Sequence, residues 1–182
     1  MPLLEKVGVS NLENLRRIKA ISVRDVLEIY DPERYVIPDY THRVMLPPGC
    51  MNLVPGAEWL ELGIRPGNGT LSFSRESDGR TRCEVGASIA GDFPEFAATG
   101  RKLLGSRWLV VTEDLNGTCR LVGTPAHPLN GVVSYSSSGR IWTFTWTGEM
   151  PDPPYYLPDY RTSILTGDSA EFDFSFDFSF DS

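Results

Sequence analysis

The sequence predicts a mainly β protein: an antiparallel β-sandwich or partial barrel with one short flanking α-helix, a long irregular loop and a C-terminal β-strand arm. Three observations predict this class. The 182 residues include 17 glycines and 14 prolines, a composition that favours many turns over long helices. Several short segments alternate apolar and polar residues, as half-buried strands do. Turn sequences separate them, and the clearest is Asn116-Gly117 between the apolar runs 108–111 and 119–122.

Length and charge limit the domain count and the class of partner. A chain of this size forms one domain, so we expect a single β-rich domain over 1–156, followed by a linker and arm over 157–182. The net charge of -7 argues against a surface that neutralises phosphates, although it suits a channel through which DNA slides. No apolar run is long enough to cross a membrane and no secretion signal opens the chain, so we expect no membrane contact.

The N-terminal segment 14–26 predicts a first strand. Its apolar period slips from one face to the other at Ala20-Ile21, which indicates a β-bulge there. Leu12, Leu15 and Ile18 lie at helical spacing, so a helix, or a helix and a strand in succession, remains the alternative.

Prolines and glycines crowd the next segment, 30–66, and predict a long loop. We expect only short strands in it, at Arg43–Leu46 and Trp59–Ile64. Loops of this length in compact domains are usually functional, and we interpret this one as a contact between subunits. A surface loop without a function is the alternative.

Three hairpins follow. The first joins strands at Thr70–Ser77 and Arg82–Ile89, the second surrounds Asn116-Gly117, and the third joins Leu129–Ser136 to Ile141–Thr147. Asn116-Gly117 predicts a turn with two consecutive positive-φ residues. The last strand alternates threonine with large rings, so one face must be buried by this domain or by a neighbour; its rings are Trp142, Phe144 and Trp146.

One helix is expected between the first two hairpins. It begins near Asp92 or Phe93, where Pro94 and Glu95 suit a first turn, and it ends at Gly105-Ser106. Gly100 weakens it locally. Its predicted apolar face consists of Phe96, Ala97, Leu103 and Leu104.

The C-terminal stretch Glu171–Ser182 alternates phenylalanine with aspartate or serine, so a strand would place every ring on one face. Such a row of rings is an aggregation hazard, and we expect the stretch to dock on a sheet edge of the same or a neighbouring subunit. A disordered, acidic low-complexity tail is the alternative. The predicted assembly contacts are Phe172, Phe174, Phe176, Phe178, Phe180, Trp59, Tyr155 and Tyr156.

No residues point to catalysis, a cofactor or a metal. His42 and His127 lie far from any cysteine at metal-ligand spacing, and no phosphate-binding or nucleophile motif is present. The cysteines at 50, 83 and 119 are too few and too widely spaced for a disulfide framework, so we expect reduced structural thiols. Carboxylate pairs could be imagined as acid and base, but solvated surface charge explains them.

The order of parts from Gly69 to Tyr156 resembles tail tube proteins of long-tailed bacteriophages and prophages, particularly those of Bacteroidetes hosts. The resemblance lies in a strand pair, a short Pro-Glu-led helix, RWLVVTEDLNGTCRLVGTPAHPL, an aromatic strand and the exit GEMPDPPYYL. It implies a virion protein without an active site, assembled in the bacterial cytoplasm with other tail proteins. Its rings, implied to be hexameric, would stack, join inner strands at 71–89 into a barrel and pass DNA without specific binding.

Two alternatives remain open at this stage. A tail terminator, neck or baseplate protein could share the fold. A β-sandwich that binds carbohydrate through Trp59, Trp142, Trp146 and Tyr155 would use the same aromatic residues differently.

Overall fold

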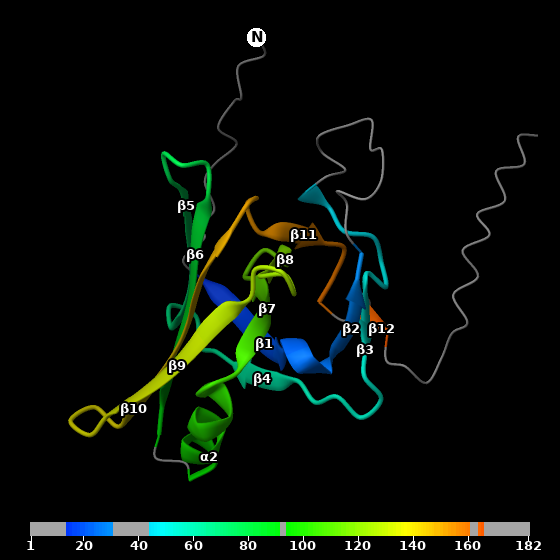
Figure 1. The fold of residues 1–182 in the computed structure, drawn as a ribbon. Helices are drawn as coiled ribbons and strands as arrows, with labels where there is room; N and C mark the ends of the chain where they lie inside the picture. Colours follow the sequence, from blue (N-terminus) through cyan, green and yellow to red (C-terminus); the bar gives the residue numbers. More distant parts are fainter. Residues whose placement is uncertain (1–13, 31–43, 92–93, 161–163, 166–182) are drawn as a thin grey trace, which may run out of the picture.

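The structure is a computed structural model that describes residues 14–30, 44–91, 94–160 and 164–165, and it confirms a mainly β fold with one short helix (Figure 1). The elements are β1 (Leu15–Ser22), the 3-10 turn η1 (Val23–Asp25), β2 (Val26–Ile29), β3 (Met51–Leu53), β4 (Leu60–Gly63), β5 (Gly69–Arg75), β6 (Thr81–Ala90), α2 (Pro94–Leu103), β7 (Arg107–Asp114), β8 (Cys119–Val122), β9 (Leu129–Ser136), β10 (Ile141–Met150), β11 (Tyr155–Leu157) and β12 (Ile164–Leu165).

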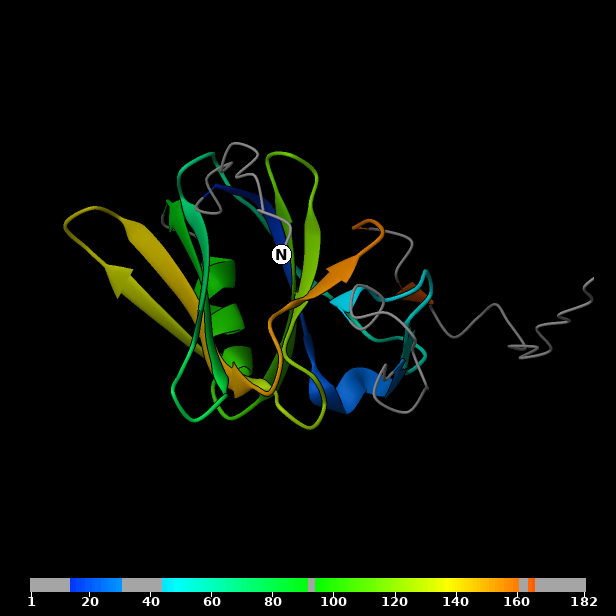
Figure 2. The same ribbon diagram turned by 90° about the horizontal axis from the view of Figure 1, so that it is seen from above.

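One large sheet runs in the order β11-β8-β7-β9-β10-β6-β5, and β1 pairs with both β7 and β4. The sheet doubles over on itself. Strands β4, β1, β7, β8 and β11 form one layer, strands β9, β10, β6 and β5 form the other, and α2 lies between the layers at one end (Figure 2). The two layers enclose a common core, whose fully buried side chains include Ile18, Leu109, Val85, Phe144 and Trp146.

The three predicted hairpins are confirmed as β5–β6, β7–β8 and β9–β10. The predicted first strand is confirmed as β1, so the helical alternative is wrong at Leu15 and Ile18. The predicted bulge is also misplaced. The pairing of β1 with β7 is regular through Ala20 and Ile21, and its irregularity lies between Leu15 and Arg17.

The turn of the central hairpin differs from the prediction. Only Gly117 has a positive φ, 82°, whereas Asn116 does not. The N–H of Gly117 donates to the carbonyl of Asp114, and the N–H of Asp114 donates to the carbonyl of Thr118. This is the three-residue loop that closes with a glycine bulge, in which one left-handed residue suffices.

A second, smaller sheet has the order β12-β3-β2. The sequence predicted β4 within 59–64 but neither β2 nor β3. Arg43 lies outside the described residues, and in the rest of the strand expected at 43–46 the structure has a single bridge, between Met45 and Tyr156. The domain boundary drawn at 156 lies inside β11, and the core continues beyond it through Leu157 and Tyr160.

The helix is confirmed at Pro94–Leu103, but half of its predicted apolar face is wrong. Ala97 and Leu104 are exposed, whereas Gly100 and Leu103 are buried. A Cβ at Gly100 would lie 2.8 Å from Cγ1 of Val133 in β9. The glycine therefore allows α2 to approach the sheet closely and is not simply a weak point.

Candidate functional site

The predicted assembly contacts are distributed over several places. The five phenylalanines of 172–180 lie outside the described residues. Trp59 is half-buried, Tyr155 is buried on β11 beside Leu121 of β8, and Tyr156 is 37% exposed. Of the described candidates, only Tyr156 therefore presents a large part of its ring to the surface.

Aromatic residues of β10 form part of the core. Phe144 and Trp146 have no exposed surface, and Phe96 of α2 packs edge-on against Phe144, with the ring centroids 5.6 Å apart. Phe96 also covers Trp142, at 6.2 Å. The chain thus buries this face itself. With Trp146 and Tyr155 enclosed, the carbohydrate-binding alternative loses two of its four rings.

A buried lysine joins the first strand to the segment that follows β11. Lys19 in β1 is 6% exposed, and its ammonium donates to the carbonyl oxygen of Tyr160. Its Nζ also lies 4.2 Å from the ring centroid of Tyr160 and 4.9 Å from that of Trp59. Burial, followed by the nearby Glu61 carboxylate, raises the pKa of the Tyr160 phenol. The cation–π contact of Lys19 with Tyr160 holds the segment around Tyr160 against β1.

A second cation lies close to Tyr156. Arg120 of β8 is 9% exposed, and its Nη2 donates to the hydroxyl of Tyr156 at 3.0 Å. The guanidinium lies 4.5 Å from the Tyr156 ring centroid and 5.4 Å from that of Phe73. Both predicted tyrosines therefore help to fix β11 to the body of the protein.

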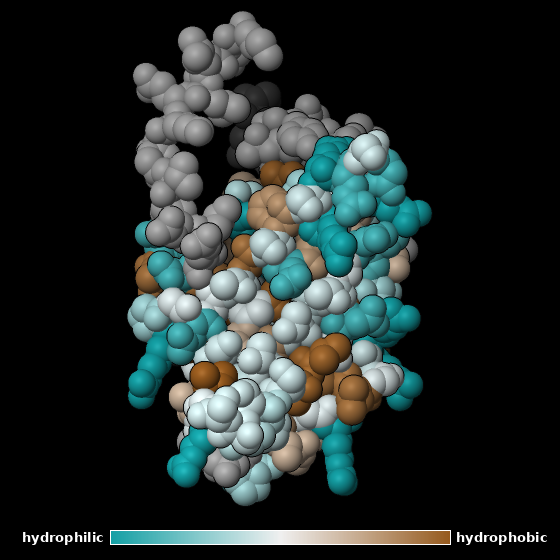
Figure 3. Space-filling view, turned by 90° about the vertical axis from the view of Figure 1, so that its left-hand side faces the viewer, coloured by the Kyte–Doolittle hydropathy of each residue, from teal (hydrophilic) through white to brown (hydrophobic). Residues whose placement is uncertain are grey.

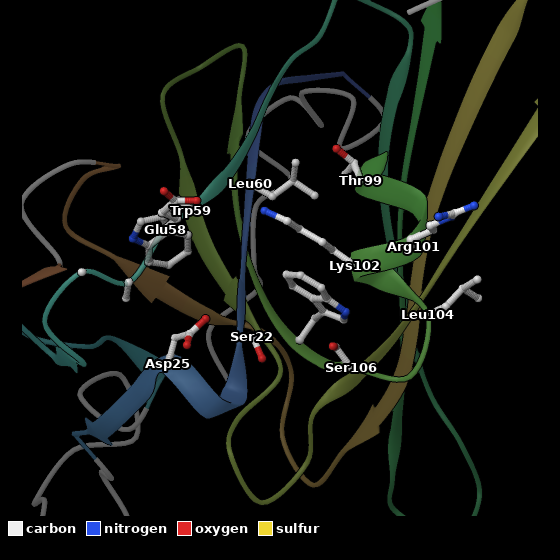
Figure 4. Close-up of a pocket in the computed structure, with 13 residues that line it drawn as sticks. Ser22, Asp25, Glu58, Trp59, Leu60, Thr99, Arg101, Lys102, Leu104 and Ser106 are labelled. Carbon is white, nitrogen blue, oxygen red and sulfur yellow. The ribbon is translucent and has the colours of Figure 1, made fainter. Parts of the chain in front are cut away.

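A groove of about 560 Å³ separates α2 from the segment that leads into β4. Its apolar lining comes from Trp59, Leu60, Leu104 and Trp108, and Leu104 is 66% exposed. Lys102 extends from α2 into the groove toward Leu60 (Figure 4).

The two walls of the groove carry opposite charges. Asp25 and Glu58 line the wall away from α2, and Arg101 and Lys102 line the α2 side. Among the described residues no ion pair joins these groups.

The outer face of the β9-β10-β6-β5 layer is lined mainly by small hydroxyl side chains. Register places Thr145 beside Val132 and Gly86, and Gly86 beside Thr70. Figure 3 views the molecule from this side and shows pale residues across its middle, some hydrophobic residues in its lower half and strongly hydrophilic residues at the margins. The exposed Val132 and Ile141 belong to this face. We name this surface the hydroxyl face and define it by Thr70, Ser72, Ser88, Ser134, Thr143, Thr145 and Thr147.

The layer that carries the hydroxyl face has two open edges. In the described part of the chain no strand pairs with the outer edge of β5, and β9 pairs with β7 only through Leu129 and Asn130. The remainder of β9, from Gly131 to Ser136, has an unpaired edge.

The cysteines at 50, 83 and 119 are all buried thiols. Burial raises the pKa of the Cys50, Cys83 and Cys119 thiols to about 11, which leaves them protonated and inert at neutral pH. No group of histidine, cysteine, aspartate and glutamate suited to a metal occurs within the described ranges. The helix that the structure describes is too short and too polar to cross a membrane.

Sequence reasoning missed the groove and the hydroxyl face. The signal for the hydroxyl face was present, because Thr143, Thr145 and Thr147 alternate with the aromatic residues of the same strand. The groove had no local signal, since its walls come from three separate segments.

No protein-family model matches this sequence, and neither a curated protein nor a solved structure matches it.

Proposed function

We propose that this chain is a non-enzymatic structural subunit of a phage tail tube, which assembles by strand pairing into rings stacked around a DNA channel. The observation that carries the proposal is the pair of open edges on the four-stranded layer. The resemblance of 69–156 to tail tube proteins supplies the identity of the assembly. It also supplies the expected hexameric ring, the neighbouring tail proteins and the location in the virion.

Most of each open edge lacks two of the usual protections against pairing, charged residues and proline, while α2 packs against β9 at Val133. Proteins blunt exposed edges with charged residues, proline or bulges. The stretches Thr70–Ser74 of β5 and Gly131–Ser136 of β9 contain no charged residue and no proline. Both edges are thus suited to accept a strand from another copy.

The strand directions allow copies to join head to tail. Successive strands β5, β6, β10 and β9 are each antiparallel to the next, so β5 and β9 run in opposite directions. The β5 edge of one copy can therefore extend the β9 edge of another without breaking the antiparallel pattern. A joint between two different edges is heterologous and closes into a ring when the rotation is right.

Such a ring would have the hydroxyl face along one continuous surface. Nucleic-acid affinity comes mainly from clustered lysine and arginine. The described hydroxyl face is uncharged over its central rows, with Arg82 and Glu84 of β6 only toward one end. A surface of this kind suits a channel wall along which DNA moves without being held.

Electron microscopy of the purified full-length chain, with light scattering over a range of concentrations, tests the proposal. We expect rings or tubes. A chain that stays monomeric at high concentration would contradict the proposal, whereas single rings that never stack would favour the tail terminator alternative.

An edge variant identifies the joint. Ser134→Lys places a charge on the open edge of β9 and should abolish rings while leaving the monomer folded. Ala98→Lys adds the same charge on the exposed surface of α2 and serves as the matched control. Rings that form equally well in both variants would show that β9 is not the joint.

A further inference from the structure

The groove beside α2 has an apolar surface that the described residues leave uncovered. Leu104 is the most exposed large hydrophobic residue described, at 66%, and it lies on the rim beside Trp59, Leu60 and Trp108. Exposed apolar surface next to a concave site is typical of a binding site.

β12 lies beside β3, the strand that precedes one wall of the groove. β12 pairs in parallel with β3, with Ile164 opposite Met51 and Leu165 opposite Asn52. Leu165 therefore lies beside Asn52, one residue before the end of β3. The residues just after β3, Gly56 to Leu60, form one wall of the groove.

The residues beyond β12 have apolar and acidic side chains that complement the apolar lining and the basic side chains of the groove. After the spacer 166–170 comes Glu171–Ser182, with phenylalanine at every second position and aspartates at 173, 177 and 181 between them. The five-residue spacer extends over about 17 Å. In an extended segment the rings share one face and the aspartates the other.

The charges on the two walls of the groove favour one orientation of the segment 171–182. Lys102 extends into the groove and, within the described part of the chain, has no ion-pair partner. Asp25 and Glu58 on the opposite wall would repel the aspartates. An acidic segment is thus favoured on the α2 side, with its rings on the apolar lining.

We propose that residues 171–182 dock in cis into the groove between α2 and 56–60, with phenylalanine rings against Trp59, Leu60, Leu104 and Trp108 and aspartates facing Lys102. The chain covers its own exposed aromatic stretch in this way. The inference concerns a single chain and does not rest on the proposed ring assembly.

Cross-linking in the full-length protein tests the inference. Leu104→Cys is combined in turn with a cysteine at each of the five phenylalanine positions, beginning with Phe176→Cys, and oxidised at pH 8. The three native thiols, with pKa values raised to about 11, compete poorly for oxidation. We expect a disulfide within the monomer, formed several-fold faster than in the control.

The matched control replaces another exposed leucine. Leu115 is 48% exposed and is replaced by cysteine in the control. It follows the last residue of β7, about 25 Å along the strand from Arg107, where β7 begins. Cross-linking at Leu115 measures how often an undocked segment reaches any surface. Equal rates at the two sites, or no cross-link at any of the five positions, would overturn the inference.

Two further results separate docking in cis from docking in trans. Mixing the Leu104→Cys variant with a Phe176→Cys variant should give no covalent dimer at micromolar concentration, and dimers formed instead of the internal cross-link would overturn the cis assignment.

Lys102→Glu should slow the internal cross-link severalfold, whereas Arg65→Glu, on an exposed residue outside the groove, should not. An unchanged rate in Lys102→Glu would overturn the orientation that places the aspartates on the α2 side.

Discussion

Single residues determine how closely the elements of this protein approach one another. Gly100 is the clearest case, because helix propensity alone would favour alanine there by about 1 kcal/mol. The Cγ1 of Val133 occupies the space that the added methyl group would need, at 2.8 Å. Packing against β9, and not local helix stability, therefore decides the residue.

Gly100→Ala should lower the free energy of unfolding by about 1 kcal/mol, since overpacking costs about 1–3 kcal/mol and helix propensity returns about 1 kcal/mol. Urea denaturation measures the change. In a Val133→Ala background the same substitution should become stabilising because the clash is removed. A destabilisation that persists unchanged in that background would show that Val133 is not the cause.

Cys50 gives the protein a pH dependence in the alkaline range. Burial raises the pKa of its thiol from 9.0 to about 11 in the folded state. Between these values the unfolded chain loses the proton while the folded chain keeps it, so the free energy of unfolding should fall as pH rises from about 9 to about 11. Cys50→Ala should make the decline shallower in denaturation curves recorded over that range, and an identical decline would contradict the assignment.

At the scale of elements, the central hairpin depends on one carboxylate. Asp114 is 8% exposed, and its Oδ1 accepts hydrogen bonds from the N–H groups of Asn116 at 2.8 Å and Thr118 at 2.9 Å. The side chain thus holds the loop that Gly117 closes. Asn116-Gly117 predicted a hairpin correctly, while the decisive contact came from the preceding aspartate.

Asp114→Ala should lower the free energy of unfolding by about 1–3 kcal/mol, because two backbone N–H groups lose their acceptor. Asp114→Asn keeps an oxygen in the same place and should cost less. Thermal unfolding of both variants measures the difference. Equal losses would show that the negative charge, and not the acceptor oxygen, stabilises the loop.

The elements that could be predicted from the sequence are those with local signals. In the β5–β6 and β9–β10 hairpins, inward and outward side chains alternate over seven or more residues in each strand, and a glycine-containing turn joins the two strands. The alternation and the turn residues therefore predict the same structure. β3 is three residues long and pairs with a strand more than a hundred positions later, so no window of sequence contains its pattern. The groove escaped prediction for the same reason, since its walls come from distant segments. Ala97 and Leu104 were assigned to the buried face of the helix, but Gly100 is the residue that packs against Val133 of β9.

At the scale of the whole molecule, the segment after β10 completes the core. Tyr155, Leu157 and Tyr160 are each less than 8% exposed, and β11 covers β8 while β12 extends the small sheet. The predicted linker over 157–182 thus begins with residues that the fold buries. Within 157–182, residues 161–163 and 166–182 lie outside the described structure.

Truncation after Met150 should abolish cooperative thermal unfolding, because it removes those three buried side chains and uncovers β8. Truncation after Leu165 keeps them and should retain a cooperative transition. Differential scanning calorimetry compares the two. A truncation at Met150 that still unfolds cooperatively at the full-length temperature would show that β11 and β12 are accessory.

The hydrogen bond from Lys19 to the carbonyl of Tyr160 spans 141 positions of the sequence. At synthesis rates of roughly 5–20 residues per second, its acceptor is made about 7–28 seconds after the lysine. During that interval the ammonium lacks this one acceptor, although Trp59 of the same site is made before Tyr160. β1 therefore gains this contact with Tyr160 only after the chain has grown by 141 positions beyond Lys19.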